Sequence, residues 1–127
     1  MKPRNGYNQS IVVAFFEEYH VPEPQFEYRF DPERKWRFDL AFMSDVPIMQ
    51  TAVEVQGGLF SGGAHVRPAR MLKEFEKWNR GVCLGWRILF VTPQTLCTLD
   101  TVKMIRGCLG LCPIPDKHIG MAKSLTK

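Results

Sequence analysis

Residues 36–56 read WRFDLAFMSDVPIMQTAVEVQ, and they contain the two strands from which the rest of the fold is predicted. Two short segments within it, RFDLAF and TAVEV, are rich in apolar residues, and a turn at residues 44–47 separates them. Each segment is predicted to be a strand, in which successive side chains point to opposite faces of a sheet. One acid lies in each strand, Asp39 in the first and Glu54 in the second. The predicted apolar face of the first strand holds Trp36, Phe38, Leu40 and Phe42.

The two acids are predicted to converge on one sheet face if these strands pair with each other. Carboxylates held together at mid-strand repel, and burial penalises both charges. A hard divalent cation with oxygen ligands would compensate for that cost. The alternative is that Asp39 and Glu54 are surface acids on the polar face of an ordinary antiparallel sheet. The spacing alone leaves both interpretations open.

The remaining sequence predicts, in order, a helix, three strands, a helix, a strand and a helix. These elements are expected at residues 12–19, 25–30, 36–42, 51–56, 68–84, 86–91 and 101–109. The long second helix has an apolar stripe that is expected to pack on the sheet, formed by Met71, Phe75, Trp78 and Val82. The apolar run at residues 86–91 is typical of a central strand that is buried on both faces. This order indicates an α/β fold with a mixed sheet.

Length and charge narrow the class of protein further. A chain of 127 residues is predicted to be one domain, residues 1–127, with a core at about 10–110 and a basic tail at 113–127. The net charge of +4 and the pI near 9.0 favour a polyanionic partner. No apolar run approaches the roughly 18 residues that a membrane span needs, so no membrane association is expected. No signal-type apolar segment follows the basic N-terminus, which predicts a cytoplasmic protein.

The four cysteines are expected to be free and buried rather than paired in disulfides, because the chain is predicted to be cytoplasmic. Cys108 and Cys112 form a CxxxC pair, with His118 nearby. A zinc site there is the alternative, but no second compact ligand pair accompanies it.

The element order and the residues together resemble the PD-(D/E)XK nuclease superfamily. Its restriction-endonuclease-like core is an α-β-β-β-α-β arrangement, with an Asp on the second strand and (D/E)XK on the third. The matching positions here are Asp39 and the EVQ of residues 54–56. The wider pattern RKWRFDLAF, AVEVQGG, SGGAHVRPAR, FEKWN and LGWRILFVTP looks like small phage and prophage-type endonucleases related to VRR-NUC and Holliday-junction-resolvase-like domains. The resemblance covers residues 15–93 and implies this core, followed by the C-terminal helix.

The resemblance implies a Mg²⁺-dependent DNA endonuclease, with Mn²⁺ as a second usable metal, in which Asp39 and Glu54 are metal ligands. Glu17 or Glu18 matches a further acidic ligand that some relatives add. This chain departs from the family at Gln56, where most members have a lysine that positions water and neutralises charge. Lys77 on the following helix is predicted to supply that charge. The alternative is that Lys77 is only a solvated partner of Glu74.

A DNA substrate predicts basic contacts on the same side as the acids. The candidates are Arg34, Lys35, Arg37, His65, Arg67 and Arg70. By family analogy, a homodimer that cuts branched or junction DNA in the host cytoplasm is expected. The main alternative, which Gln56 keeps open, is a nuclease fold that only binds DNA or serves as a partner subunit. A small protein-binding inhibitor or structural factor is the third possibility.

Overall fold

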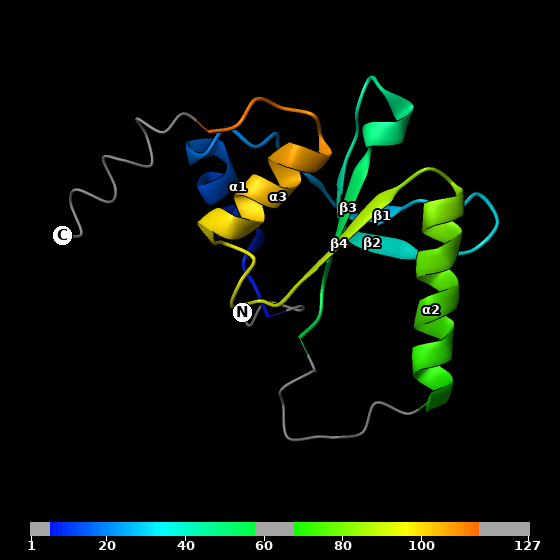
Figure 1. Cartoon of the computed structure of the whole chain (residues 1–127). Coiled ribbons are helices and arrows are strands. Elements are labelled where there is room, and N and C mark those ends of the chain that lie inside the picture. The colour runs from blue at the N-terminus through cyan, green and yellow to red at the C-terminus, as the bar shows by residue number, and fades with distance from the viewer. Residues whose placement is uncertain (1–5, 58–67, 115–127) are drawn as a thin grey trace.

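The computed structural model describes residues 6–57 and 68–114, which form an α/β fold with a four-stranded mixed sheet and three α-helices (Figure 1). The elements follow the order predicted from the sequence. They are α1 (Gln9–Glu18), β1 (Gln25–Arg29), β2 (Arg37–Phe42), the 3₁₀ helix η1 (Pro47–Met49), β3 (Thr51–Val55), α2 (Pro68–Cys83), β4 (Arg87–Val91) and α3 (Leu99–Cys108). Only η1, in the predicted turn before β3, was not expected. In the described part of the chain, no helix is both long and apolar enough to cross a membrane.

The sheet has the strand order β1-β2-β3-β4. The first two pairings are antiparallel, whereas β3 and β4 are parallel and α2 makes the crossover between them. The expectation that residues 86–91 form a central strand is therefore wrong, because β4 pairs with β3 alone within the described residues. The strand is also not buried on both faces, because Phe90 is 49% exposed.

Helices cover both faces of the sheet, and each face has its own apolar core. Helices α1 and α3 lie together on one face and α2 lies on the other (Figure 1). The larger core joins α1 and α3 to the sheet and includes Phe16, Leu40, Val53 and Ile105. The smaller core lies on the α2 side of the sheet. It includes Phe30, Phe38, Ala41, Ala52 and Trp86.

Side-chain alternation breaks at one level of the β1–β2 hairpin, next to Asp39. Phe26 and its partner Leu40 pack in the larger core, whereas Tyr28 and its partner Phe38 pack in the smaller one. A regular strand would place both pairs on the same face. Between these pairs lies Glu27, whose φ of +51° is in the left-handed region that side chains other than glycine rarely adopt. The prediction that Phe38 shares a face with Leu40 is thus wrong.

Helix α2 presents a different side to the sheet from the one that its apolar stripe predicts. Gly81 is the buried residue of this helix, and its backbone lies against the ring of Phe38 and the side chain of Ile88. Phe75 and Val82 of the predicted stripe are exposed. The helix is therefore rotated relative to this expectation: Gly81 makes the close approach to the sheet, and Trp78 of the stripe contacts Phe90 of β4 with ring centroids 4.7 Å apart.

Substitution of Gly81 should show how much the close packing of α2 on the sheet contributes to stability. A Cβ atom at this position would lie 2.8 Å from Cζ of the fully buried Phe38 ring. We expect Gly81→Ala to lower the free energy of unfolding by about 1–3 kcal/mol, despite the higher helix propensity of alanine. The matched control is Gly107→Ala in α3, where an added Cβ meets no atom within 4 Å. It should raise stability by about 0.5–1 kcal/mol, and both effects can be measured by urea unfolding.

Candidate active site

Asp39 and Glu54 lie on adjacent strands, on the side of the sheet that α2 covers. Residues Leu40 and Val53 are the last paired positions of β2 and β3, and the two acids come directly beyond them. Alternation along β3 is regular, so Glu54 shares the α2 face with Ala52 while Val53 and Val55 enter the larger core. The predicted convergence of the two acids is present.

Each carboxylate is held by the backbone of the opposite strand. The amide of Asp39 donates to Oε2 of Glu54 at 3.1 Å, and the amide of Val55 donates to Oδ2 of Asp39 at 2.7 Å. These reciprocal bonds replace the regular ladder at this level of the sheet. Both donors are backbone N–H groups, which remain when a neighbouring side chain is replaced. They hold the two carboxylates in position.

Helix α2 supplies the remaining partners of Glu54. Nζ of Lys77 lies 2.5 Å from Oε1 of Glu54, and the indole N–H of Trp78 donates to the same oxygen at 3.1 Å. Lys77 and Glu54 are both largely buried, so the ion pair is shielded from water. Lys77 therefore lies beside the acids as predicted. No ion pair joins it to Glu74 among the described residues.

Burial and the neighbouring carboxylate together raise the pKa of Asp39 to about 7. Loss of hydration is the larger cause, and the charge of Glu54 is the second. The amide of Val55 and the ammonium of Lys77 act in the opposite direction, because both favour the charged form. Asp39 is thus poised to lose its proton near neutral pH, and any cation bound beside it would favour that loss.

The raised pKa makes stability depend on pH with a definite sign. Between its ordinary pKa of 3.8 and about 7, Asp39 binds more protons in the folded state than in the unfolded state. Its contribution to stability therefore falls as pH rises through this range and is constant above it. We expect Asp39→Asn to remove on the order of 1–3 kcal/mol of this pH dependence, with allowance for solvent screening of a partly exposed group. Urea unfolding from pH 4 to pH 8 measures it, and a parental profile in the variant would contradict the assignment.

The other predicted site residues are distributed unevenly around the acids. Gln56 is two residues after Glu54 and directly follows β3, and its backbone N–H donates to the carbonyl oxygen of Val91 in β4. Glu17 and Glu18 are exposed at the end of α1, which covers the opposite face of the sheet (Figure 1). The structure does not bring either of them to Asp39 and Glu54. The expectation of a third acidic ligand from α1 is wrong because the sheet itself separates the two.

The basic residues that the sequence nominates for DNA contact are exposed where the structure describes them. Arg34, Lys35 and Arg37 lie in and after the β1–β2 turn, and Arg70 lies in the first turn of α2. Arg34 pairs with Glu76 of α2 at 3.7 Å, so this turn and α2 are on one side of the molecule. His65 and Arg67 lie outside the described residues.

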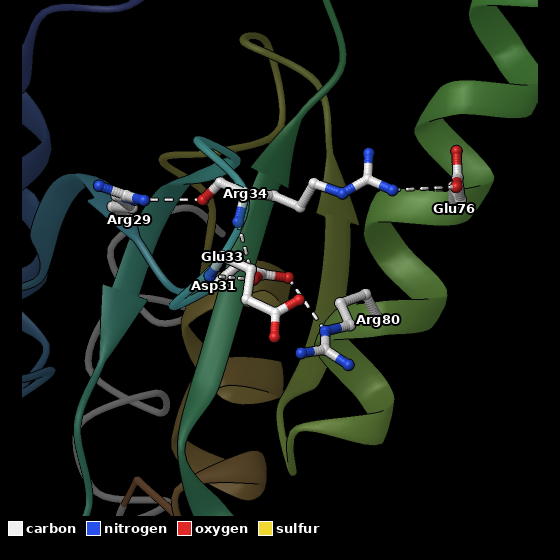
Figure 2. Close-up of polar contacts among 6 residues, drawn as sticks. All are labelled: Arg29, Asp31, Glu33, Arg34, Glu76 and Arg80. Carbon is white, nitrogen blue, oxygen red and sulfur yellow. Dashed lines mark hydrogen bonds and ion pairs between the residues drawn. The ribbon is translucent and has the colours of Figure 1, made fainter.

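The buried carboxylate of Asp31 ties this turn to α2. Figure 2 shows Asp31 between the turn and the helix. Its Oδ1 accepts the amides of Glu33 at 2.8 Å and Arg34 at 3.0 Å, and its Oδ2 accepts Nε of Arg80 at 3.0 Å. The Arg34 amide is the largest influence that holds the pKa of Asp31 below its usual range, although burial opposes it. An acid that opens an Asp-Pro turn is the signal that could have identified this contact.

Replacement of Asp31 should destabilise both the β1–β2 turn and the packing of α2 against it. We expect Asp31→Ala to lower Tm by several degrees, because three donors lose their acceptor: the amides of Glu33 and Arg34 and the guanidinium of Arg80. The matched control is Glu76→Ala, which breaks the exposed pair with Arg34 and should leave Tm nearly unchanged. Equal Tm shifts in the two variants would show that the buried contacts of Asp31 stabilise the fold no more than the exposed Arg34–Glu76 pair does.

The cysteines are free, as predicted, but none of them is fully buried. Cys83 and Cys112 are exposed, and Cys97 and Cys108 are partly buried. Burial raises the pKa of the Cys97 thiol. Within residues 6–57 and 68–114, no three His, Cys, Asp or Glu side chains form a group that could hold a metal ion. His118, the third member of the alternative zinc site, lies outside the described residues.

Comparison with known proteins identifies no relative of this chain. No family model matches it, and neither a curated protein nor a solved structure shows significant similarity.

Proposed function

We propose that this protein is a metal-dependent DNA endonuclease that hydrolyses phosphodiester bonds. The observation that carries the proposal is the meeting of two mid-sheet carboxyl groups with a buried ammonium: Asp39 and Glu54 from the strands and Lys77 from α2. Two adjacent acids accompanied by a lysine, with the pKa of Asp39 raised, form an arrangement that folding alone does not require. The resemblance of the sequence to PD-(D/E)XK nucleases suggests that this arrangement binds a metal ion for phosphodiester hydrolysis.

The acids have the chemistry that Mg²⁺ or Mn²⁺ requires, since both metals prefer carboxylate oxygens. Two carboxylate oxygens are fixed by backbone amides, which orients the groups before any ligand arrives. In the absence of a metal, the ammonium of Lys77 neutralises Glu54. A bound cation would lower the pKa of a coordinated water molecule and stabilise negative charge on the phosphate.

In most of the superfamily one lysine both positions water and supplies positive charge. Here Lys77 and Gln56 would each perform one of these two roles. The ammonium of Lys77 supplies positive charge that can stabilise the developing phosphate charge. The amide of Gln56 can position water by hydrogen bonding, but it carries no charge. Once a cation neutralises the acids, Lys77 is released from its role as counter-ion and can serve the substrate.

The proposal extends to the fold and the substrate. The element order and the mixed sheet are compatible with a restriction-endonuclease-like core, and we assign the chain to that topology. The exposed arginines and lysine of the β1–β2 turn, together with Arg70, would contact the DNA backbone. Branched or junction DNA is the preferred substrate class in this proposal, with a homodimer acting in the cytoplasm of a phage host.

A DNA-binding protein without cleavage activity is the second candidate. Gln56 favours it, because the position that carries a charged lysine in most of the superfamily is neutral here. The described residues also bring two rather than three acids together. Tight DNA binding without cleavage under any divalent cation would support this candidate.

Cleavage of plasmid and four-way-junction DNA with Mg²⁺ or Mn²⁺ tests the proposal. We expect Asp39→Ala and Glu54→Ala to reduce the rate at least a hundredfold, because each removes a metal ligand. Lys77→Ala should reduce cleavage sharply but leave DNA affinity nearly unchanged, whereas Gln56→Lys should be tolerated or activating. The parental protein should lose activity in EDTA and regain it when Mg²⁺ is added.

The controls for this experiment come from the same helix. Glu76→Ala removes an exposed acid of α2 and should cut at the parental rate. Thermal unfolding of every variant separates loss of activity from loss of the fold. Parental cleavage by the Asp39→Ala protein would remove the basis of the proposal.

A further inference from the structure

An exposed apolar surface lies beside the acids, where α2 extends past β4. Four of its side chains are largely exposed: Leu72 at 65%, Phe75 at 48%, Val82 at 59% and Phe90 at 49%. Trp78 connects the two phenylalanines, because its ring contacts Phe75 with centroids 6.0 Å apart and Phe90 with centroids 4.7 Å apart. We define the edge surface as Met71, Leu72, Phe75, Trp78, Val82 and Phe90.

Three charged residues of α2 make ion pairs away from this surface, whereas the half-buried Glu74 is next to the stripe in sequence. Lys77 is directed to Glu54, and Arg80 reaches Asp31 at the other side of the helix. Glu76 pairs with Arg34 of the β1–β2 turn. The stripe along α2 is therefore uninterrupted by charge, with residues spaced i, i+4, i+7 and i+11 along one side of the helix.

The stripe is self-complementary under a two-fold axis. Met71 and Val82 are equidistant from its midpoint, and so are Phe75 and Trp78. When two copies of α2 pack antiparallel about that midpoint, Met71 of each lies opposite Val82 of the other, and Phe75 lies opposite Trp78. Two-fold interfaces require this property, because the same patch must serve both subunits.

The size of the edge surface fits the centre of such an interface. Two half-exposed phenylalanines leave roughly 200 Å² of ring surface in water, since an aromatic side chain buries 150–250 Å². Leu72 and Val82 add about as much again, which places the patch in the range of roughly 300–600 Å² that is often functional on a monomer. A standard interface buries about 800 Å² per partner, so the patch and a polar rim around it would suffice.

Other occupants fit the surface less well. DNA would need basic side chains within the patch, whereas the edge surface contains no charged residue and the ammonium of Lys77 and the guanidinium of Arg80 pair with Glu54 and Asp31. The segment at residues 115–127, DKHIGMAKSLTK from Asp116 onward, is predominantly polar and charged. It follows Ile114, which is buried in the core of the opposite sheet face.

We propose that the edge surface is the interface of a two-fold dimer in which α2 of one copy packs antiparallel on α2 of a second copy. Edge strand β4 lies beside this contact, so the dimer also shields a sheet edge that pairs with no strand among the described residues. Trp78 takes part in the interface and donates to Glu54, which links the contact directly to the acids. The inference names an interface for the homodimer that is part of the proposed function, but the association can be tested without any measurement of cleavage.

Sedimentation velocity of the full chain over micromolar concentrations tests this dimer. The parental protein should approach 29.4 kDa, twice the chain mass of 14.7 kDa. We expect Leu72→Glu, Phe75→Glu and Val82→Glu each to raise the dimer Kd at least tenfold. The matched control is Ile11→Glu, which places the same charge at a residue that is 63% exposed on α1, on the other face of the sheet, and should not change Kd.

A charge pair tests the antiparallel geometry itself. Met71→Lys and Val82→Glu should each weaken the dimer, but the double variant should recover at least tenfold in Kd, because each lysine then faces a glutamate of the second copy. Within one chain these positions are 11 residues apart, about 16 Å along the helix, and cannot pair. A parental protein that stays monomeric, stripe variants that dimerise normally, or a double variant weaker than both single variants would overturn the proposal.

Discussion

The buried charge of Glu54 is the constraint around which this molecule is arranged. This residue is only 1% exposed within the sheet, where an unpaired carboxylate would cost several kcal/mol. Compensation comes from three directions: the amide of Asp39, the ammonium of Lys77 and the indole of Trp78. Two of these partners belong to α2, so the requirement for charge balance determines which side of that helix meets the sheet.

The orientation of α2 explains several features that look unrelated. With Lys77 directed inward, Gly81 becomes the point of closest approach, and a larger residue would meet Phe38. Arg80, one turn further, reaches the buried Asp31 and anchors the helix to the β1–β2 turn (Figure 2). The apolar stripe is left beyond the sheet, exposed along β4. A helix that served only the hydrophobic core would have buried the stripe instead.

The sequence was sufficient for the order of elements, because periodicity and turn residues report local conformation directly. It also placed Asp39, Glu54 and Lys77 together, since strand alternation and helix spacing carry that information. What it could not supply was set by tertiary context. A left-handed Glu27 has no compositional signal, and it moves Tyr28 and Phe38 to the other face from Phe26 and Leu40. The exposure of Phe90 and the burial of Asp31 depend on which helices and strands pack beside them. Local sequence patterns do not show which elements will be neighbours in the fold.

The sheet topology has a consequence for the route by which the chain folds. Pairings β1–β2 and β2–β3 join segments that are adjacent in sequence, whereas β3–β4 pairing must wait for the α2 crossover to close. Until α2 docks, Glu54 lacks both Lys77 and Trp78, and its carboxylate is hydrated on the uncovered sheet face; docking removes this water and supplies both partners at once. Docking of the helix and neutralisation of that acid are therefore one cooperative event. The element that completes the chemistry of the site is also the element whose arrival commits the chain to its native state.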